Sequence, residues 1–240
     1  MAGRSAAGGS MNGRTAAGKG ASGKGAKVTA PRLSPVRLDE LRDEPSPDFQ
    51  RGERYDGVRF SRADADGLEL SGTDFAECEF AGVSFNETQL RGATFRDCIL
   101  AEVYAPVFTA ARATLREVEI SNPRWGSAEL YESGWTSVRI DGGKLDYVNL
   151  RGSRLTDVQI SDCIINELDL GSVTGTRVAL KNCTIGTLDL AGAKFKDFDL
   201  RGTDFRTISG LESLAWVVID DYQPTLLAPL LAAHLGVTVL

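Results

Sequence analysis

Residues 70–100 read LSGTDFAECEFAGVSFNETQLRGATFRDCIL, and every fifth residue of this stretch is a leucine or a phenylalanine. The spacing continues on both sides, from residue 56 to residue 205, which makes thirty units of five residues. The centre of a unit is large and apolar except at Ala65, Ala105, Ala110 and Gly175. A period of five fits neither an α-helix, at about 3.6, nor a β-strand, at about 2. It predicts a chain that turns a corner once per unit.

A second column of smaller side chains lies two residues before the centres. One large and one small side chain therefore point inward in each unit, and the other three positions are mostly polar. Such a chain must coil, and stacked coils allow each backbone segment to pair with the turns above and below it. The small column contains Thr73, Cys78, Val83, Thr88, Ala93, Cys98, Val103, Ala113, Val118, Ser153, Val158, Cys163, Val173, Val178, Cys183, Ala193 and Thr203.

This pattern resembles the pentapeptide-repeat family over about 150 of the 240 residues. The resemblance implies an all-β fold, a right-handed quadrilateral β-helix with four units, or twenty residues, in each coil. The sequence supports that coil length, because Cys78 and Cys98 lie twenty residues apart, as do Cys163 and Cys183. Thirty units would make 7.5 coils, and at about 4.8 Å per coil the rod would be roughly 36 Å long.

Three regions are expected along the chain. Residues 1–50 are predicted to be a disordered tail and linker, because the first thirty contain eight glycines and eight alanines and few large apolar side chains. Residues 51–208 form the solenoid. Residues 209–240 form a C-terminal cap, with a helix over 225–235 that ends at Gly236 and a last strand over 237–240. The cap either closes the exposed end of the solenoid or also joins two copies through residues 211–240, since some family members dimerise through C-terminal helices.

The repeat is weakest between residues 104 and 125. Two centres there are small, at Ala105 and Ala110, and two prolines occur, at Pro106 and Pro123. Proline cannot donate a hydrogen bond to the strand ladder, so this stretch is predicted to form a local bulge or loop. A protrusion that binds a partner is the alternative.

The sequence predicts no catalytic, cofactor-binding or metal-ligating residue. His234 is the only histidine and lies near the C-terminus, so no Ser-His-Asp arrangement can form within the repeats. The four cysteines occupy the small inward position and are expected to be packing residues. Residues 13–19 and 18–24 approach the phosphate-binding loop pattern, but both lack the serine or threonine that would hold magnesium.

The charge is distributed unevenly along the chain. Residues 1–37 carry seven basic and no acidic side chains, whereas the other 203 residues have a net charge of −13. A body of that sign is not expected to bind nucleic acid directly. The sequence shows neither a signal peptide nor a membrane-spanning stretch, which predicts a cytoplasmic protein.

Two sets of carboxylates are candidate partner-binding residues, although a solvated face with weak ion pairs is the simpler interpretation of both. The first set lies in one outward column of the repeat, and the second lies on the most acidic side of the predicted rod. The acidic column comprises Glu77, Asp97, Glu117, Asp157 and Asp197, and the acidic side comprises Asp64, Asp66, Glu87, Asp146, Glu167 and Asp204.

Two functions remain open at this point. The first is a non-enzymatic binding or scaffold protein that contacts an unidentified protein partner through the surface of the rod. The second follows from the resemblance, because the quinolone-resistance members of the family bind DNA gyrase by imitating duplex DNA: a DNA-mimicking inhibitor or protector of this type II topoisomerase would confer antibiotic resistance. Residues 56–205 have a net charge of only −8, whereas duplex DNA of the same length carries about 20 negative charges.

Overall fold

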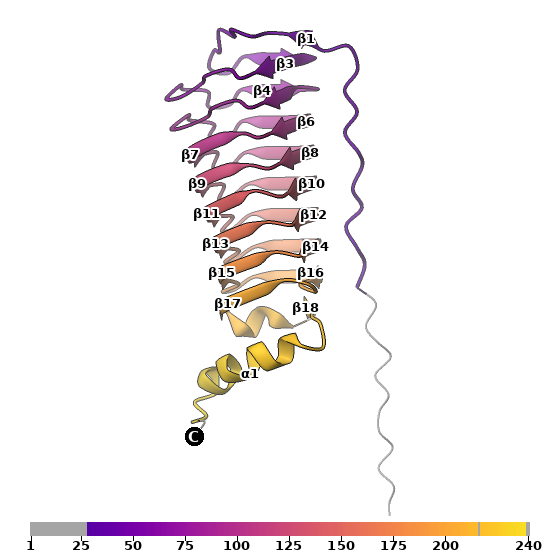
Figure 1. The fold of residues 1–240 in the computed structure, drawn as a ribbon, viewed down its shortest axis with the longest axis vertical. Coiled ribbons are helices and arrows are strands. Elements are labelled where there is room, and N and C mark those ends of the chain that lie inside the picture. Colours follow the sequence, from indigo (N-terminus) through magenta and orange to yellow (C-terminus); the bar gives the residue numbers. More distant parts are fainter. Residues whose placement is uncertain (1–27, 216, 239–240) are drawn as a thin grey trace, which may run out of the picture.

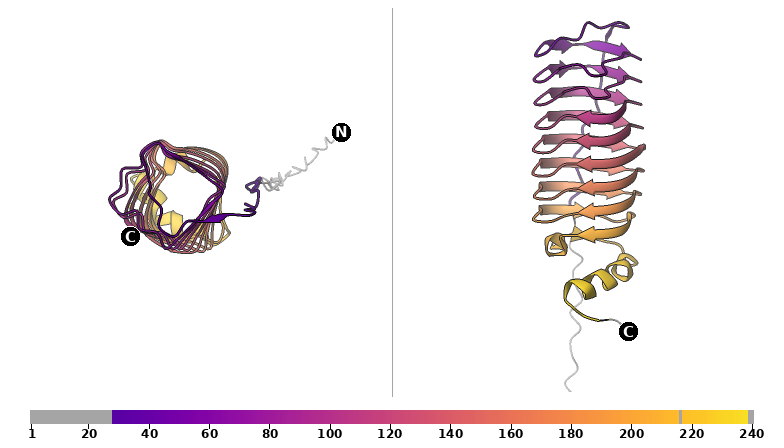
Figure 2. Two further views of the ribbon diagram at one scale, coloured as in Figure 1. Left: turned by 90° about the horizontal axis from the view of Figure 1, so that it is seen from above. Right: turned by 90° about the vertical axis from the view of Figure 1, so that its left-hand side faces the viewer.

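The computed structural model describes residues 28–215 and 217–238. Its body is a rod of stacked coils in which parallel strands pair with the strand of the next coil (Figure 1). Trp135 pairs with Leu115 on one side and with Leu155 on the other, so one coil contains twenty residues. Seen from its end, the rod has a four-sided outline (Figure 2). The predicted right-handed quadrilateral β-helix is confirmed.

The strands form two sheets. The larger contains β1 (Arg42–Asp43), β2 (Arg54–Asp56), β3 (Val58–Ser61), β4 (Asp74–Ala76), β5 (Glu79–Ala81), β6 (Thr94–Ala101), β8 (Thr114–Ser121), β10 (Gly134–Asp141), β12 (Arg154–Ser161), β14 (Thr174–Lys181), β16 (Lys194–Asp199) and β18 (Val217–Val218). The smaller contains β7 (Tyr104–Thr109), β9 (Arg124–Glu129), β11 (Lys144–Asn149), β13 (Ile164–Asp169), β15 (Thr184–Asp189) and β17 (Asp204–Ser209).

The rod has about 9 turns, more than the 7.5 expected from residues 56–205. The additional turns come from chain outside the regular repeat. At one end β1 pairs with β3, and at the other end β18 pairs with β16. Both flanking strands continue the ladder without the five-residue pattern, because backbone pairing requires an extended chain and not a particular side chain.

The core lies inside the coils, where every unit centre is buried, as the repeat predicts. The phenylalanines of the first coils stack on one another, with Phe75 and Phe95 5.1 Å apart between ring centroids. Gly175 is one of the few small unit centres, and it lies against the ring of Phe195. A Cβ at Gly175 would lie 2.4 Å from that ring, so the small centre makes room for a large one in the next coil.

The bulge or loop predicted between residues 104 and 125 does not occur, because β7, β8 and β9 stay in register with their neighbours. The two prolines take positions at which no ladder bond is lost. Pro123 lies between two strands. The backbone N–H groups of Val103 and Cys163, which occupy the same column in other coils, donate to no backbone carbonyl, so a proline in this column removes no ladder bond. Pro106 lies at the corner of β7 and has no paired residue in the register of β7 with β9. The same finding removes the alternative of a protrusion.

The C-terminal cap closes the rod with a 3₁₀ turn, η1 (Leu211–Leu214), and a helix, α1 (Gln223–His234). Gln223 is fully buried, and its side-chain amide donates to the backbone carbonyls of Leu200 and Thr203, 2.9 Å and 2.7 Å away. The predicted last strand is not formed over its described residues, 237–238. Gly236 adopts a positive φ of 71°, and the N–H of Val237 turns back to Ala232, as in a Schellman motif. The helix itself begins two residues earlier than predicted.

Residues 28–50 correct the expectation of disorder, whereas residues 1–27 of the predicted tail lie outside the described residues. Residues 28–41, named here the arm, run along the outside of the rod in the direction opposite to the stacking of the coils (Figure 1). The prolines of the arm favour an extended chain rather than a disordered one. The apolar side chains between the prolines pack against the rod, which the Gly- and Ala-rich composition of the first thirty residues does not indicate.

Candidate partner-binding surfaces

The five carboxylates of the acidic column lie at one corner of the rod. Each occurs where the chain bends, with φ between 51° and 59°. Ser137 and Arg177 occupy the same column in the remaining two coils. Side chains at such a bend point away from the core, which places the carboxylates above one another along the rod. This corner is named here the acidic corner.

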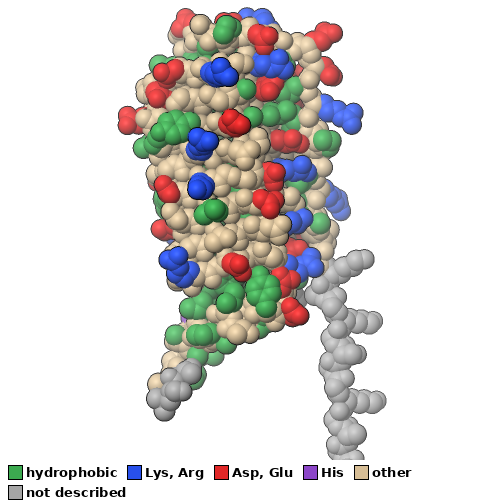
Figure 3. All heavy atoms as spheres, viewed as in Figure 1, with side chains coloured by type: hydrophobic (Ala, Val, Ile, Leu, Met, Phe, Trp, Pro, Cys, Tyr) green, Lys and Arg blue, Asp and Glu red, His purple; other side chains and the backbone are tan. Residues whose placement is uncertain are grey.

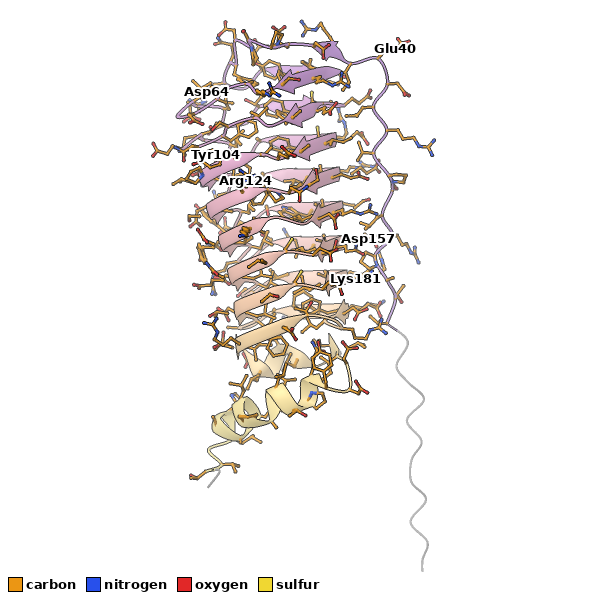
Figure 4. The ribbon with its side chains drawn as sticks, in the orientation of Figure 1. Glu40, Asp64, Tyr104, Arg124, Asp157 and Lys181 are labelled. Atoms are coloured by element: carbon orange, nitrogen blue, oxygen red, sulfur yellow. The ribbon has the colours of Figure 1, made fainter. Side chains whose placement is uncertain are left out.

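The acidic corner is covered by the arm. Backbone N–H groups of the arm donate to side chains of successive coils at or beside the corner, and the arm passes Asp157 in Figure 4. The four hydrogen bonds run from Thr29 to Asp197 (3.2 Å), from Arg32 to Asp157 (2.8 Å), from Ser34 to the Ser137 hydroxyl (3.1 Å) and from Val36 to Glu119 (3.2 Å). Eight residues of the arm, 29–36, therefore cross the coils from Asp197 to Glu119. The chain here is extended, with its donors pointing at the rod.

Packing of apolar side chains accompanies these hydrogen bonds. Six apolar residues of the arm are half-buried, whereas the residues between them, including Ala30 and Pro35, are exposed. This alternation is what an extended chain shows when one edge faces a surface. The half-buried residues are Val28, Pro31, Leu33, Val36, Leu38 and Leu41.

Asp157 is the best-bonded carboxylate of the acidic corner. It forms a bidentate pair with Arg177 of the next coil, at 2.6 Å and 2.7 Å, and accepts the Arg32 amide as well. The hydrogen bonds from Arg177 hold the pKa of Asp157 below its usual range, aided by the Arg32 amide and opposed by burial. Only 8% of Asp157 is exposed, so this outward-pointing residue is not free for a partner while the arm is docked.

The upper part of the corner has a different electrostatic character. Asp97 and Glu117 are neighbours in adjacent coils, and the hydrogen bond that they share raises the pKa of Glu117, with burial and charge repulsion acting in the same direction. Like charges are thus crowded here, whereas the carboxylate of Asp157 is neutralised by an arginine. The acidic corner is therefore not a uniform row of free negative charges.

The residues of the predicted acidic side are all exposed, but they do not form a continuous patch. Asp64, Asp66 and Glu87 belong to the first coils, and Asp66 is bonded to the Ser84 hydroxyl and the Asn86 amide. Asp146 and Glu167 lie in the middle of the rod, and Asp204 lies at the far end. Arg124 and Lys144 lie in the same columns, at the paired position of β9 and β11, and interrupt the negative charge.

A groove lies on this side of the rod, between β7, β9 and β11. Its volume is about 720 Å³, and Tyr104 and Arg124, seen one above the other in Figure 4, lie on its rim. Two glycines form its floor. A Cβ at Gly126 would lie 2.3 Å from the Pro106 carbonyl oxygen, and a Cβ at Gly143 would lie 2.5 Å from that of Pro123. The groove, named here the Tyr104 groove, is lined by Glu102, Tyr104, Pro106, Asn122, Arg124, Trp125, Gly126, Gly143, Lys144 and Asp146.

The Tyr104 groove combines exposed apolar and basic side chains. Half of Tyr104 is exposed, and Val107 beside it and Ile164 farther along the same side are also exposed. Arg124 and Lys144 form no ion pair with any described carboxylate. Aromatic and arginine side chains that are free to be covered are enriched in protein–protein contacts.

The cysteines and the histidine show no arrangement for chemistry within the described residues. All four thiols are buried and free, and burial raises the pKa of the Cys98 thiol. No three His, Cys, Asp or Glu side chains of the described chain could share a metal ion. His234 ends helix α1 on the cap, away from the repeats. No described helix is long and apolar enough to cross a membrane.

Two candidate binding features, the arm and the Tyr104 groove, were not predicted from the sequence, although each leaves a signal there. The arm is marked by apolar residues at intervals of two or three between Val28 and Leu41. The Tyr104 groove is marked by the twenty-residue period itself, since Gly126 follows Pro106 and Gly143 follows Pro123 by one coil. These signals can be interpreted only when the coil length is known, because it decides which residues are neighbours in adjacent coils.

Comparisons with known proteins bear on the repeat. Residues 57–100 match the family "Pentapeptide repeats" in eight copies. Among solved structures, QnrB1, a plasmid-mediated fluoroquinolone resistance protein, is 21% identical; the match covers 81% of this chain and 96% of QnrB1, with a TM-score of 0.40. HetL, a pentapeptide repeat protein involved in heterocyst differentiation regulation in the cyanobacterium Nostoc, is 18% identical over 71% of this chain and 91% of its own, with a TM-score of 0.37. Among curated proteins no sequence matches.

The family match covers the first coils, and the coils that follow repeat the same five-residue pattern with the same burial and the same twenty-residue register. Residues 57–100 therefore match the pentapeptide-repeat family, and the fold that they begin runs through the rest of the rod.

Proposed function

We propose that this protein is a non-enzymatic binding rod that contacts a partner protein through the Tyr104 groove. The observation that carries the proposal is the combination on one side of the rod of a groove, an exposed tyrosine and two basic side chains without carboxylate partners. Several arginines elsewhere on the rod are already paired with carboxylates, for example Arg112 with Glu132 and Arg151 with Asp169.

The rigidity of the rod supports a binding role. The floor residue Gly126 lies within β9 and Gly143 directly precedes β11, and the residues on either side of Gly126 and the strand after Gly143 are paired with the neighbouring coils. A partner would therefore find the rim residues already in place, and little conformational entropy would be lost on binding. The expected partner surface is acidic where it meets Arg124 and Lys144 and apolar where it covers Tyr104.

Affinity capture from the source organism with matched variants tests the proposal. The groove variant Tyr104→Ala/Arg124→Glu is compared with the wild-type protein and with Thr136→Ala/Arg154→Glu, which makes similar changes at exposed positions of β10 and β12. A partner should be enriched by the wild-type protein and by the control variant, and lost by the groove variant. Equal enrichment by all three proteins would place the binding surface elsewhere.

The gyrase-directed alternative requires a continuous negative surface, and the arrangement of charges gives it little support. The acidic corner is covered by the arm and partly neutralised by Arg177, and the acidic side is interrupted by Arg124 and Lys144. On the face drawn in Figure 3, acidic and basic side chains are interspersed. A supercoiling assay with purified gyrase over a range of salt concentrations tests this alternative. Inhibition, or protection from quinolones, that weakens as salt rises would favour DNA mimicry over the groove.

The cap supports a second proposal, that two copies associate through residues 211–240. Apolar side chains gather over the cap in Figure 3, and Leu226, Leu231, Leu235 and Val237 are exposed. An apolar surface of this kind is expected to be covered in solution. Sedimentation of the wild-type protein and of Leu231→Glu/Leu235→Glu tests it: a dimer that the variant converts to a monomer is expected, and a monomeric wild-type protein would refute it.

A further inference from the structure

The arm and the acidic corner form a contact of a different kind from the backbone ladders that join the coils. Coils bind one another through backbone-to-backbone hydrogen bonds, for example from Thr114 to Ala93 and from Arg154 to Ser133. Between Thr29 and Val36, the arm instead donates its backbone N–H groups to side chains, most of them carboxylates. The corner thus presents a row of acceptors that would receive any extended chain with donors at the same spacing.

The contact is also weaker than those within the rod. None of residues 28–41 is fully buried, whereas each coil buries all its centres. Segments with few buried side chains open at a lower free energy than the core of a fold. The arm can therefore leave the corner while the coils stay folded.

The charges favour an arm that stays near the corner when it opens. The basic part of the arm is residues 28–37, which carry the exposed Arg32 and Arg37 and no acid; Asp39 and Glu40 follow beyond Val36, the last arm residue bonded to the rod. The corner presents Glu117, Asp157 and Asp197. Attraction between the two raises the rate of return, and the tether keeps the arm at an effective concentration of the order of millimolar. A competing segment would have to overcome that tether.

We propose that the acidic corner is a recognition track for an extended, basic and proline-containing peptide segment, and that the arm is a releasable strap that occupies this track. The strap masks Asp157 and its neighbours until a segment of the same chemistry, from a partner protein, displaces it. The segment needs backbone donors toward the corner and an apolar side chain at every second or third residue. The proposal is independent of the Tyr104 groove, which lies on the opposite side of the rod from the arm in Figure 4.

A labelled peptide with the sequence of residues 28–41 tests the proposal on the full-length chain. In the variant Leu33→Asp/Val36→Asp, two half-buried apolar residues become acids that face an acidic corner, so the strap is released. Fluorescence anisotropy should show that this variant binds the peptide at least about tenfold more tightly than the wild-type protein, whose own arm competes at the same site.

Two further variants complete the design. Ala30→Asp/Pro35→Asp adds the same charge at exposed positions of the arm and should bind the peptide as weakly as the wild-type protein does. Adding Asp157→Ala and Asp197→Ala to the strap-release variant removes two of the acceptors and should weaken binding at least about tenfold, while circular dichroism shows that the rod remains folded. The proposal is overturned if the strap-release variant does not bind the peptide, or if it binds no more tightly than the wild-type protein.

Discussion

The coils of the rod and the arm that crosses them are both extended chain laid against the same structure, yet they are held by different forces. A coil is held by a backbone ladder on each side and by buried side chains at every fifth residue. The arm is held by four hydrogen bonds to side chains and by residues that are only half-buried. Substitutions of outward residues are therefore expected to leave the rod folded, whereas docking of the arm depends on individual outward residues.

The largest effect is expected inside the coils. Leu150 is a fully buried centre in the middle of the rod. Leu150→Asp would place a carboxylate without a partner in the core, at a cost of more than about 4 kcal/mol, and should unfold the coils around it. Thermal unfolding followed by circular dichroism measures this. A variant with the melting temperature of the wild-type protein would refute the assigned register.

A smaller effect is expected in the floor of the Tyr104 groove. At Gly143, φ is 97° and a Cβ would lie 2.5 Å from the Pro123 carbonyl oxygen. Gly143→Ala should therefore destabilise the protein by about 1–3 kcal/mol, through strain and displacement of the neighbouring coil. Chemical denaturation gives the value, with Gly134→Ala as control, since a Cβ at Gly134 meets no atom within 4 Å. Equal destabilisation by the two substitutions would contradict the close approach of the coils at Pro123.

The arm should respond to changes that leave the coils intact. The sequence alone predicts that Asp157→Ala has little effect, but the side chain is buried by the arm and bonded to it and to Arg177. The substitution should remove about 1–3 kcal/mol from the docking of the arm and change the melting temperature of the rod much less. Hydrogen exchange of the Arg32 and Ser34 amides measures the first quantity. Unchanged protection of both amides would show that the carboxylate does not hold the arm.

Acid should act in the same direction as that substitution. Arg177, a residue of the rod, is the main cause of the lowered pKa of Asp157, and the Arg32 amide lowers this pKa further only when the arm is docked. The contribution of Asp157 to docking is therefore complete above the ordinary pKa of about 3.9. It is lost as the pH falls through the lowered pKa. NMR signals of residues 28–36 should therefore move toward those of a free peptide below about pH 4, before the coils unfold. Simultaneous loss of arm and coil signals would argue against a separately releasable arm.

The pair of Asp97 and Glu117 should show the smallest effect and the opposite sign. The pKa of Glu117 is raised by its neighbour Asp97, so the two carboxylates oppose each other at neutral pH, and protonation of Glu117 relieves this as the pH falls toward its raised pKa. Glu117→Gln should raise the melting temperature at pH 7 slightly, and less at pH 4. A lower melting temperature at pH 7 would show that the Glu117 charge has a stabilising partner.

The repeat predicted the interior more reliably than the exterior. The centres from Phe60 to Phe205 and the small column are buried as their spacing requires, because inward positions face the same environment in every coil. The bulge predicted from Pro106 and Pro123 does not form. A proline destabilises a strand ladder only at a position whose backbone N–H would donate to it, and the sequence does not show which positions those are. The candidate carboxylates of the acidic column lie at one corner of the rod, but the repeat did not predict which residues bond to them. Arg177 lies twenty residues after Asp157, and Arg32 lies 125 residues before it.

The sequence by itself determined the coil, because a five-residue period with a large apolar centre can bury those centres only if the chain turns at each unit. The twenty-residue register was implied by the resemblance to a known family and supported by the two pairs of cysteines twenty residues apart. Tertiary structure alone decided that the arm docks on the acidic corner and that a groove opens beside Tyr104. The physical reason is that the repeat fixes only inward side chains, whereas outward side chains meet their partners through contacts between residues far apart in the chain.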